Sequence, residues 1–153
     1  MTVEERREPG GEGFEPVDHT ADVALRIWAA DLEGLFRQAA LGLVSFLTDP
    51  EQVSAVERHE LRIEGIDLEE LLVAWLGELL YRFETEQFLL ADCRRLRIER
   101  QGTAYLLEAT VHGERFDPRR HPGGTEIKAA TYHGLRILPG ETGAYEVTVV
   151  LDT

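Results

Sequence analysis

Apolar and polar residues alternate over several short stretches of the chain. Val23, Leu25 and Ile27 recur at every second position, which is the spacing of a half-buried strand. A second alternating stretch covers residues 59–65 and ends at Gly65. The same period predicts later strands at residues 93–98, 105–111, 125–132 and 145–151.

Two longer segments instead repeat apolar residues every three or four positions, as amphipathic helices do. The first follows Asp31, a favourable N-cap, and reaches Leu47. It should end there because Pro50 is near and the residue before a proline disfavours the helical conformation. The second begins after Asp67 and carries Trp75 on a broad apolar stripe, so we expect Trp75 to pack in the core.

The order of these elements predicts the fold class and the domain organisation. Two helices interleaved with early strands, then a run of strands, indicate an α+β fold of two layers, in which two helices cover a mostly antiparallel sheet. Residues 1–13 are charged or glycine-rich with little to bury, which predicts a flexible leader. Residues 14–153 contain no repeat or linker, so we expect a single domain there.

Composition narrows the possible partners and the compartment. The 153 residues include 16 basic and 29 acidic side chains, and the net charge of −13 disfavours direct nucleic-acid binding and favours cations or a basic partner. The single cysteine, Cys93, excludes an intramolecular disulfide. No apolar run approaches the roughly 20 residues of a membrane span, and the N-terminus lacks an apolar signal core. We therefore expect a cytoplasmic protein.

An acidic group stands directly before the first predicted strand, where Asp18, His19 and Asp22 fall within five positions. The local sequence offers no nucleophile for them to activate, and the other four histidines lack the spacing of zinc ligands. Aspartates at strand ends do suit calcium or magnesium, which bind several oxygens. If the last strand pairs near the first, Asp152 and the terminal carboxylate of Thr153 would join the site. Alternatively, Asp22 caps a turn and Asp152 is solvated.

Lys128 is the second unusual residue. It lies in a stretch that otherwise fits an interior strand, where lysine is rarely buried without a partner. Its ammonium would neutralise the acidic group or contact a phosphate. The alternative is a lysine at the rim of the sheet whose ammonium extends into water.

Five motifs occur in the same order as in a known family. They are Asp18-His-Thr-Ala-Asp22, Leu47-Thr-Asp49, Trp75-Leu-x-Glu-Leu-Leu-Tyr81, Gly124-Thr-Glu-Ile-Lys-Ala-Ala-Thr-Tyr-His133 and the closing Leu151-Asp152. With these motifs the chain resembles the archease family from about Phe14 to the C-terminus.

The resemblance implies a small α+β protein that activates an RtcB-type RNA ligase without being a ligase itself. Archease-like proteins promote guanylylation of that GTP-dependent ligase, which then turns over repeatedly in tRNA splicing and RNA repair. Carried over by motif, Asp22 and Asp152, with Thr153, hold a divalent cation, calcium or magnesium, and Lys128 acts on the ligase. The alternative function is a small metal-dependent hydrolase using Asp22, Asp152 and His19, which needs an open coordination position.

Overall fold

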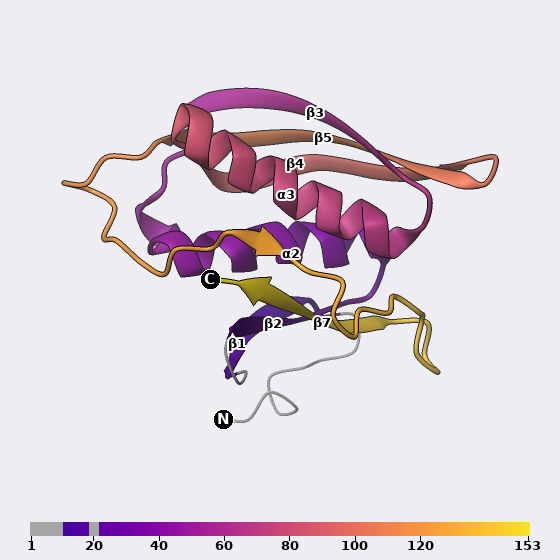
Figure 1. The fold of residues 1–153 in the computed structure, drawn as a ribbon. Coiled ribbons are helices and arrows are strands. Elements are labelled where there is room, and N and C mark those ends of the chain that lie inside the picture. Colours follow the sequence, from indigo (N-terminus) through magenta and orange to yellow (C-terminus); the bar gives the residue numbers. More distant parts are fainter. Residues whose placement is uncertain (1–10, 19–21) are drawn as a thin grey trace.

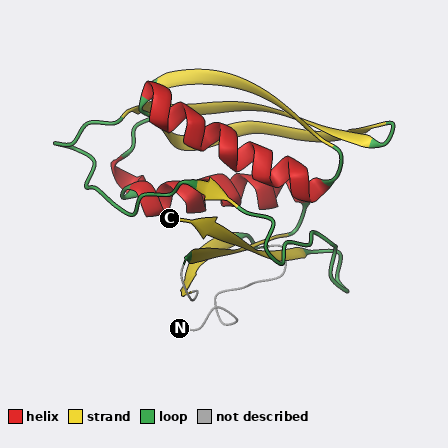
Figure 2. Ribbon diagram, viewed as in Figure 1, coloured by secondary structure: helices red, strands yellow, loops and turns green. Residues whose placement is uncertain are grey.

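Residues 11–18 and 22–153 are described by the computed structural model. Within this part of the chain, two antiparallel β-sheets enclose a layer of two helices (Figures 1 and 2). The helices therefore bury apolar side chains on two sides, which gives the protein one continuous core.

The first sheet has the strand order β1-β2-β7-β6. Its strands are β1 (Gly13–Asp18), β2 (Val23–Ala29), β6 (Ala129–Ala130) and β7 (Tyr145–Asp152). All neighbours in it run antiparallel. The last strand of the chain thus lies between one of the first strands and the very short β6.

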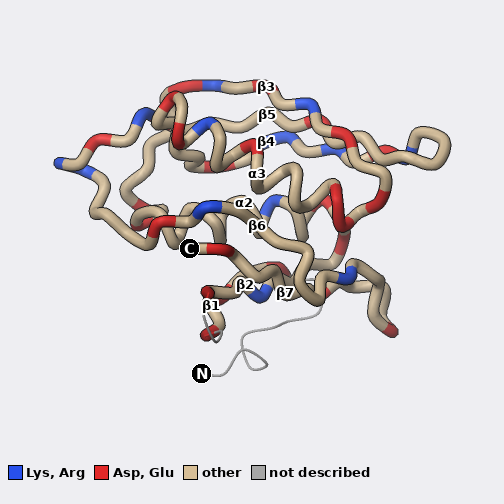
Figure 3. Tube along the Cα trace, in the orientation of Figure 1, with Lys and Arg blue, Asp and Glu red and all other residues tan. Residues whose placement is uncertain are grey.

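The second sheet has the order β3-β5-β4 and is also antiparallel. Its strands are β3 (Glu57–Gly65), β4 (Phe88–Gln101) and β5 (Ala104–Arg115). The β4–β5 hairpin turns at Gly102, whose φ of 65° suits glycine better than other residues. One face of this sheet packs on the helices. Acidic and basic residues occur repeatedly along its three strands (Figure 3), and most of these charged positions are exposed.

The helices begin where a local side chain can satisfy one of their free backbone N–H groups. Helix α2 (Leu32–Leu47) starts after Asp31, whose carboxylate accepts a hydrogen bond from Gly34 N–H at 2.7 Å. Helix α3 (Leu68–Glu86) starts in the same way after Asp67. A short 3-10 helix, η1 (Pro50–Gln52), follows α2 and leads toward β3.

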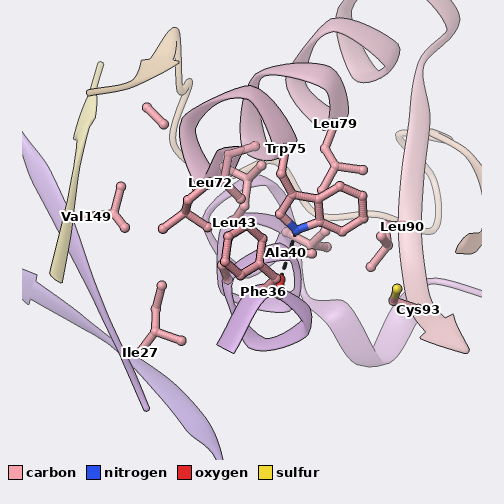
Figure 4. Close-up of a cluster of buried hydrophobic side chains, with 14 of the residues drawn as sticks. Ile27, Phe36, Ala40, Leu43, Leu72, Trp75, Leu79, Leu90, Cys93 and Val149 are labelled. Atoms are coloured by element: carbon pink, nitrogen blue, oxygen red, sulfur yellow. Dashed lines mark hydrogen bonds between the residues drawn. The ribbon is translucent and has the colours of Figure 1, made fainter. Parts of the chain in front are cut away.

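The core lies where the two helices meet each other and both sheets. Trp75 of α3 is fully buried, and its indole N–H donates to the carbonyl oxygen of Phe36 in α2 at 2.9 Å (Figure 4). Ile27 and Val149 approach this cluster from the first sheet, and Leu90 approaches it from the second (Figure 4). The prediction that Trp75 is a core residue is confirmed.

The α+β class and the first helix bounds agree with the sequence prediction, but the strands form two sheets instead of one. The helices are apolar enough to be covered on both sides, since α2 contacts β1 and β2 of one sheet and β4 of the other. Strand β1 precedes the first predicted strand and was not expected. Because it begins at Gly13, it also overlaps the end of the predicted leader, while residues 1–10 of that leader lie outside the described residues.

The predicted strand at 125–132 shortens to the two residues of β6. The segment 122–128, here called the strap, runs instead along the C-terminal end of α2. Thr125 N–H donates to the carbonyl oxygen of Phe46 at 2.7 Å, and a Cβ on Gly124 would lie only 2.1 Å from that same oxygen. This close backbone contact binds the first part of the strap to the helix, so the chain reaches the sheet only at the last residue of the strap, Lys128.

None of the described helices is long and apolar enough to cross a membrane.

Candidate functional site

The first sheet brings Asp22 and Asp152, which are far apart in the sequence, close together. In the β2–β7 pair, Val23 lies opposite Leu151, and one further step along each strand reaches Asp22 and Asp152. Residues directly opposite in an antiparallel pair have their Cβ atoms roughly 5 Å apart. The strand pairing that the sequence analysis required for a shared acidic site is therefore present, with Thr153 as the next residue.

The carboxylate oxygens of the two aspartates form no hydrogen bonds with other described residues. Asp152 is exposed and Asp22 is half-buried. Neither side chain forms a hydrogen bond or ion pair with another described residue. His19, which falls between Asp18 and Asp22 in the sequence, lies outside the described residues. Asp49 has a local role, because its carboxylate accepts from Glu51 N–H at the start of η1.

Lys128 lies close to these two aspartates in the fold, next to the C-terminal end of β7. Its backbone N–H donates to the carbonyl oxygen of Asp152 at 2.7 Å, and the next residue, Ala129, pairs with Asp152. Its side chain is exposed and forms no ion pair with the carboxylates of residues 11–18 and 22–153. Lys128 is also the only lysine in the sequence. The ammonium is thus accessible and is not used to neutralise the aspartates.

The chemistry of these donors fits a hard divalent cation. Carboxylate and carbonyl oxygens are the ligands of calcium and magnesium, and both kinds occur at the ends of β2 and β7. No group of three or more His, Cys, Asp or Glu side chains suited to a metal occurs within the described residues. Asp22 and Asp152, supplemented by backbone or terminal oxygens, are the candidate ligand set predicted from the sequence.

A buried polar cluster fixes the loop that leads from β5 to the strap. Glu114 is 7% exposed and accepts hydrogen bonds from Arg120 Nη1 at 2.6 Å and from Ser54 N–H at 2.7 Å. His121, 1% exposed, contacts Glu114 through Nε2 at 2.9 Å. Because His121 Nδ1 accepts from Asp117 N–H at 2.8 Å, the ring proton lies on Nε2 and is donated to Glu114.

The sequence pattern did not connect Glu114, Arg120 and His121 with one another, so this cluster was not predicted. Three of its members fall within eight positions, but Ser54 is 60 residues away from Glu114. No periodic pattern marks such an arrangement. The cluster holds the loop at its start, while the contact of Thr125 with Phe46 holds it further along, so the backbone before Lys128 is fixed at two points.

The environment of Glu114 strongly favours its ionised form. The hydrogen-bonded Arg120 guanidinium lowers the pKa of Glu114 to about 2, against the opposing effect of burial and with help from Ser54 N–H and His121. Burial has the opposite result for the lone thiol, because it raises the pKa of Cys93 to about 11. Cys93 is therefore protonated at neutral pH and unsuited to nucleophilic chemistry.

We expect Glu114→Gln to lower the free energy of unfolding at pH 7 by about 2–3 kcal/mol, because charge-assisted hydrogen bonds are lost in a buried place. The folded pKa lies below the unfolded value, so this stabilisation is complete above roughly pH 5 and disappears as the pH falls toward 2. Urea unfolding at pH 7 and pH 3 measures both effects. Glu141→Gln, at an exposed position, is the control. An equal difference from wild type at both pH values would contradict the assignment.

A comparison with known protein families finds a match that covers every residue of the candidate site. The model of the archease protein family matches residues 14–153, which include both aspartates, Lys128 and the strap. The chain belongs to the archease family. The resemblance drawn from the five motifs is thereby confirmed.

Relatives and a solved structure of similar length agree with this assignment. Protein archease of Methanopyrus kandleri is 37% identical over 139 residues, which cover 91% of this chain and 98% of that protein. Protein archease of Danio rerio is 36% identical, covering 91% of this chain and 84% of that protein. The solution structure of Methanobacterium thermoautotrophicum protein 1598 superposes with a TM-score of 0.77 at 32% identity, covering 92% and 99% of the two chains.

Proposed function

We propose that this protein is a cytoplasmic, non-enzymatic activator of an RtcB-type RNA ligase. It promotes guanylylation of the GTP-dependent ligase, so that the ligase joins RNA ends repeatedly in tRNA splicing and RNA repair. Membership of the archease family supports this role. The observation that carries it is the exposed Lys128 beside the ends of β2 and β7, where two aspartates have no described partner.

In this proposal the aspartates hold a divalent cation and the lysine acts on the partner. Asp22, Asp152 and the carboxyl end at Thr153 provide oxygen ligands for calcium or magnesium. When bound, the ion supplies positive charge that offsets the carboxylates at the strand ends. Lys128, attached by its backbone to Asp152, presents its ammonium to the ligase or to the phosphates of the bound nucleotide.

The charge of the protein supports a protein partner over direct RNA binding. A net charge of −13 repels the phosphate backbone, which disfavours any grip on the RNA itself. The same charge attracts a basic surface, and an RNA-handling enzyme needs a basic surface for its own substrate.

A turnover assay tests the function directly. An RtcB-type ligase is incubated with GTP, divalent metal and RNA ends, with or without substoichiometric wild-type protein. We expect the number of joined ends per ligase molecule to rise from about one to many, because each ligase is guanylylated again after each round. The protein alone, assayed for phosphatase and nuclease activity with calcium or magnesium, is the control. Unchanged turnover of an active ligase, or hydrolysis by the protein alone, would contradict the proposal.

A further inference from the structure

A hollow lies beside the strap and is lined by residues up to Ile127, which precedes Lys128. Its volume is about 280 Å³. The apolar part of its wall combines side chains from the ends of both helices, from the start of the β5–β6 loop and from the strap: Leu47, Phe83, Phe116 and Ile127. Ile127 immediately precedes Lys128, so one residue of the lining is the direct neighbour of the lysine in the chain.

The residues that line the hollow are held in place by contacts with their neighbours. Phe83 and Phe116 meet edge to face with ring centroids 5.8 Å apart, and Phe116 also stacks on the buried His121. The strap, which also lines the hollow, is fixed to α2 by the contact between Thr125 and Phe46. Ile127 is 3% exposed, whereas Lys128 is exposed, which is the alternation of an extended segment. The two side chains therefore serve opposite sides of the strap.

Both charged residues that line the hollow are acidic. Glu84 comes from the last turn of α3 and Glu126 from the strap, and both are exposed. Neither forms an ion pair with another residue in the described ranges 11–18 and 22–153. An apolar floor with an acidic rim is complementary to an apolar side chain that is flanked by basic residues.

The size of the hollow indicates what kind of group enters it. Small-molecule sites usually measure about 300–1,000 Å³ and enclose most of their ligand, so this hollow is below that range. It does suit one large side chain of a protein partner, and anchoring side chains of this kind dominate many interfaces. Gly123 and Gly124 contribute backbone without side chains to the lining, which leaves the space open.

We propose that this hollow receives one apolar side chain from a basic segment of the ligase, which anchors the complex while Lys128 acts on the ligase. This inference rests on the proposed function and adds a second contact to it. The two contacts have different roles. The hollow determines how tightly the partner is held, and Lys128 determines what happens once it is held.

Gly123 is a position at the hollow where a bulky side chain can be added without disturbing the fold. It lines the hollow, and a Cβ placed on it would meet no atom within 4 Å. Gly77, on the exposed side of α3, has equally free space and does not line the hollow. Gly123→Leu is therefore the blocking variant and Gly77→Leu its matched control. Glu84→Lys tests the acidic rim without adding bulk to the floor.

The experiment measures ligase stimulation across a range of activator concentrations, together with direct binding to the ligase. We expect Gly123→Leu to raise the half-maximal concentration roughly 10- to 30-fold, as loss of an anchor does, and to leave maximal stimulation unchanged. Glu84→Lys should slow association severalfold at low salt, an effect that salt suppresses. Gly77→Leu should match wild type, and unfolding curves should show all three variants folded.

The outcomes separate this inference from the function on which it rests. If wild type stimulates the ligase but Gly123→Leu and Glu84→Lys both bind within twofold of it, the hollow is not the anchor and the proposed function stands. If Gly123→Leu lowers only maximal stimulation, its effect is on activation, and the anchoring role is overturned. If wild type neither binds nor stimulates the ligase, the proposed function fails and this partner assignment fails with it.

Discussion

Lys128→Ala should reduce stimulation of the ligase to the level seen without activator, while binding to the ligase falls by less than tenfold. The reason is that the exposed ammonium has no described partner within the protein and so is free to serve another molecule. Its removal takes away a charge and leaves the apolar hollow intact. Lys128→Ala should therefore lower maximal stimulation, which distinguishes it from a variant that weakens docking.

The control for Lys128→Ala is Arg136→Ala. Arg136 is likewise an exposed cation without an ion pair among the described residues, but it lies on the loop between β6 and β7. Because Lys128 is the only lysine, an amine-acylating reagent can modify just its side chain and the N-terminus. Acylated wild type should behave like Lys128→Ala. Full activity of Lys128→Ala at saturating concentration would remove this residue from the mechanism.

Asp22→Asn combined with Asp152→Asn should weaken calcium binding roughly 100-fold or more, because cation affinity depends strongly on the number of charged ligands. Each substitution keeps the shape of the side chain and removes one negative charge. Isothermal titration with calcium or magnesium measures the affinity directly. Calcium should also raise the melting temperature of wild type, since a ligand that binds only the folded state stabilises it, and this shift should vanish in the double variant.

A matched control for the cation site lies on the other sheet. Asp92 of β4 is half-buried like Asp22, but it contacts Arg94 and belongs to the second sheet, whereas β7 belongs to the first. Asp92→Asn should bind calcium as wild type does. If the double variant binds calcium as tightly as wild type, Asp22 and Asp152 are not the ligands, and the cation site must be sought elsewhere.

Much of the local structure was predictable because it depends on neighbouring residues. Asp31 and Asp67 each cap the helix that begins at the next residue, and their carboxylates accept from the N–H groups three residues later. The apolar stripe around Trp75 likewise follows from helical spacing alone. The bounds of α2 and the core position of Trp75 were therefore predictable without knowledge of the rest of the chain.

The strap shows why the 125–132 segment was misjudged. Its alternating sequence is that of a strand, and Ile127 is indeed buried while Lys128 is exposed. However, Gly124 approaches the end of α2 so closely that the segment bonds to the helix before it reaches the sheet. Such a contact joins residues 79 positions apart, from Phe46 to Thr125, and alternation carries no information about it.

By itself, the sequence determined to which family the chain belongs, because motifs are local and keep their order. It singled out Asp22, Asp152 and Lys128 as unusual for their surroundings. Only the tertiary structure decided that β7 lies between β2 and β6, since strand order depends on contacts between distant segments. This order brings the three positions together at the same end of the first sheet. The tertiary structure alone also revealed the hollow beside the strap, because a hollow is formed by surfaces that meet only after folding.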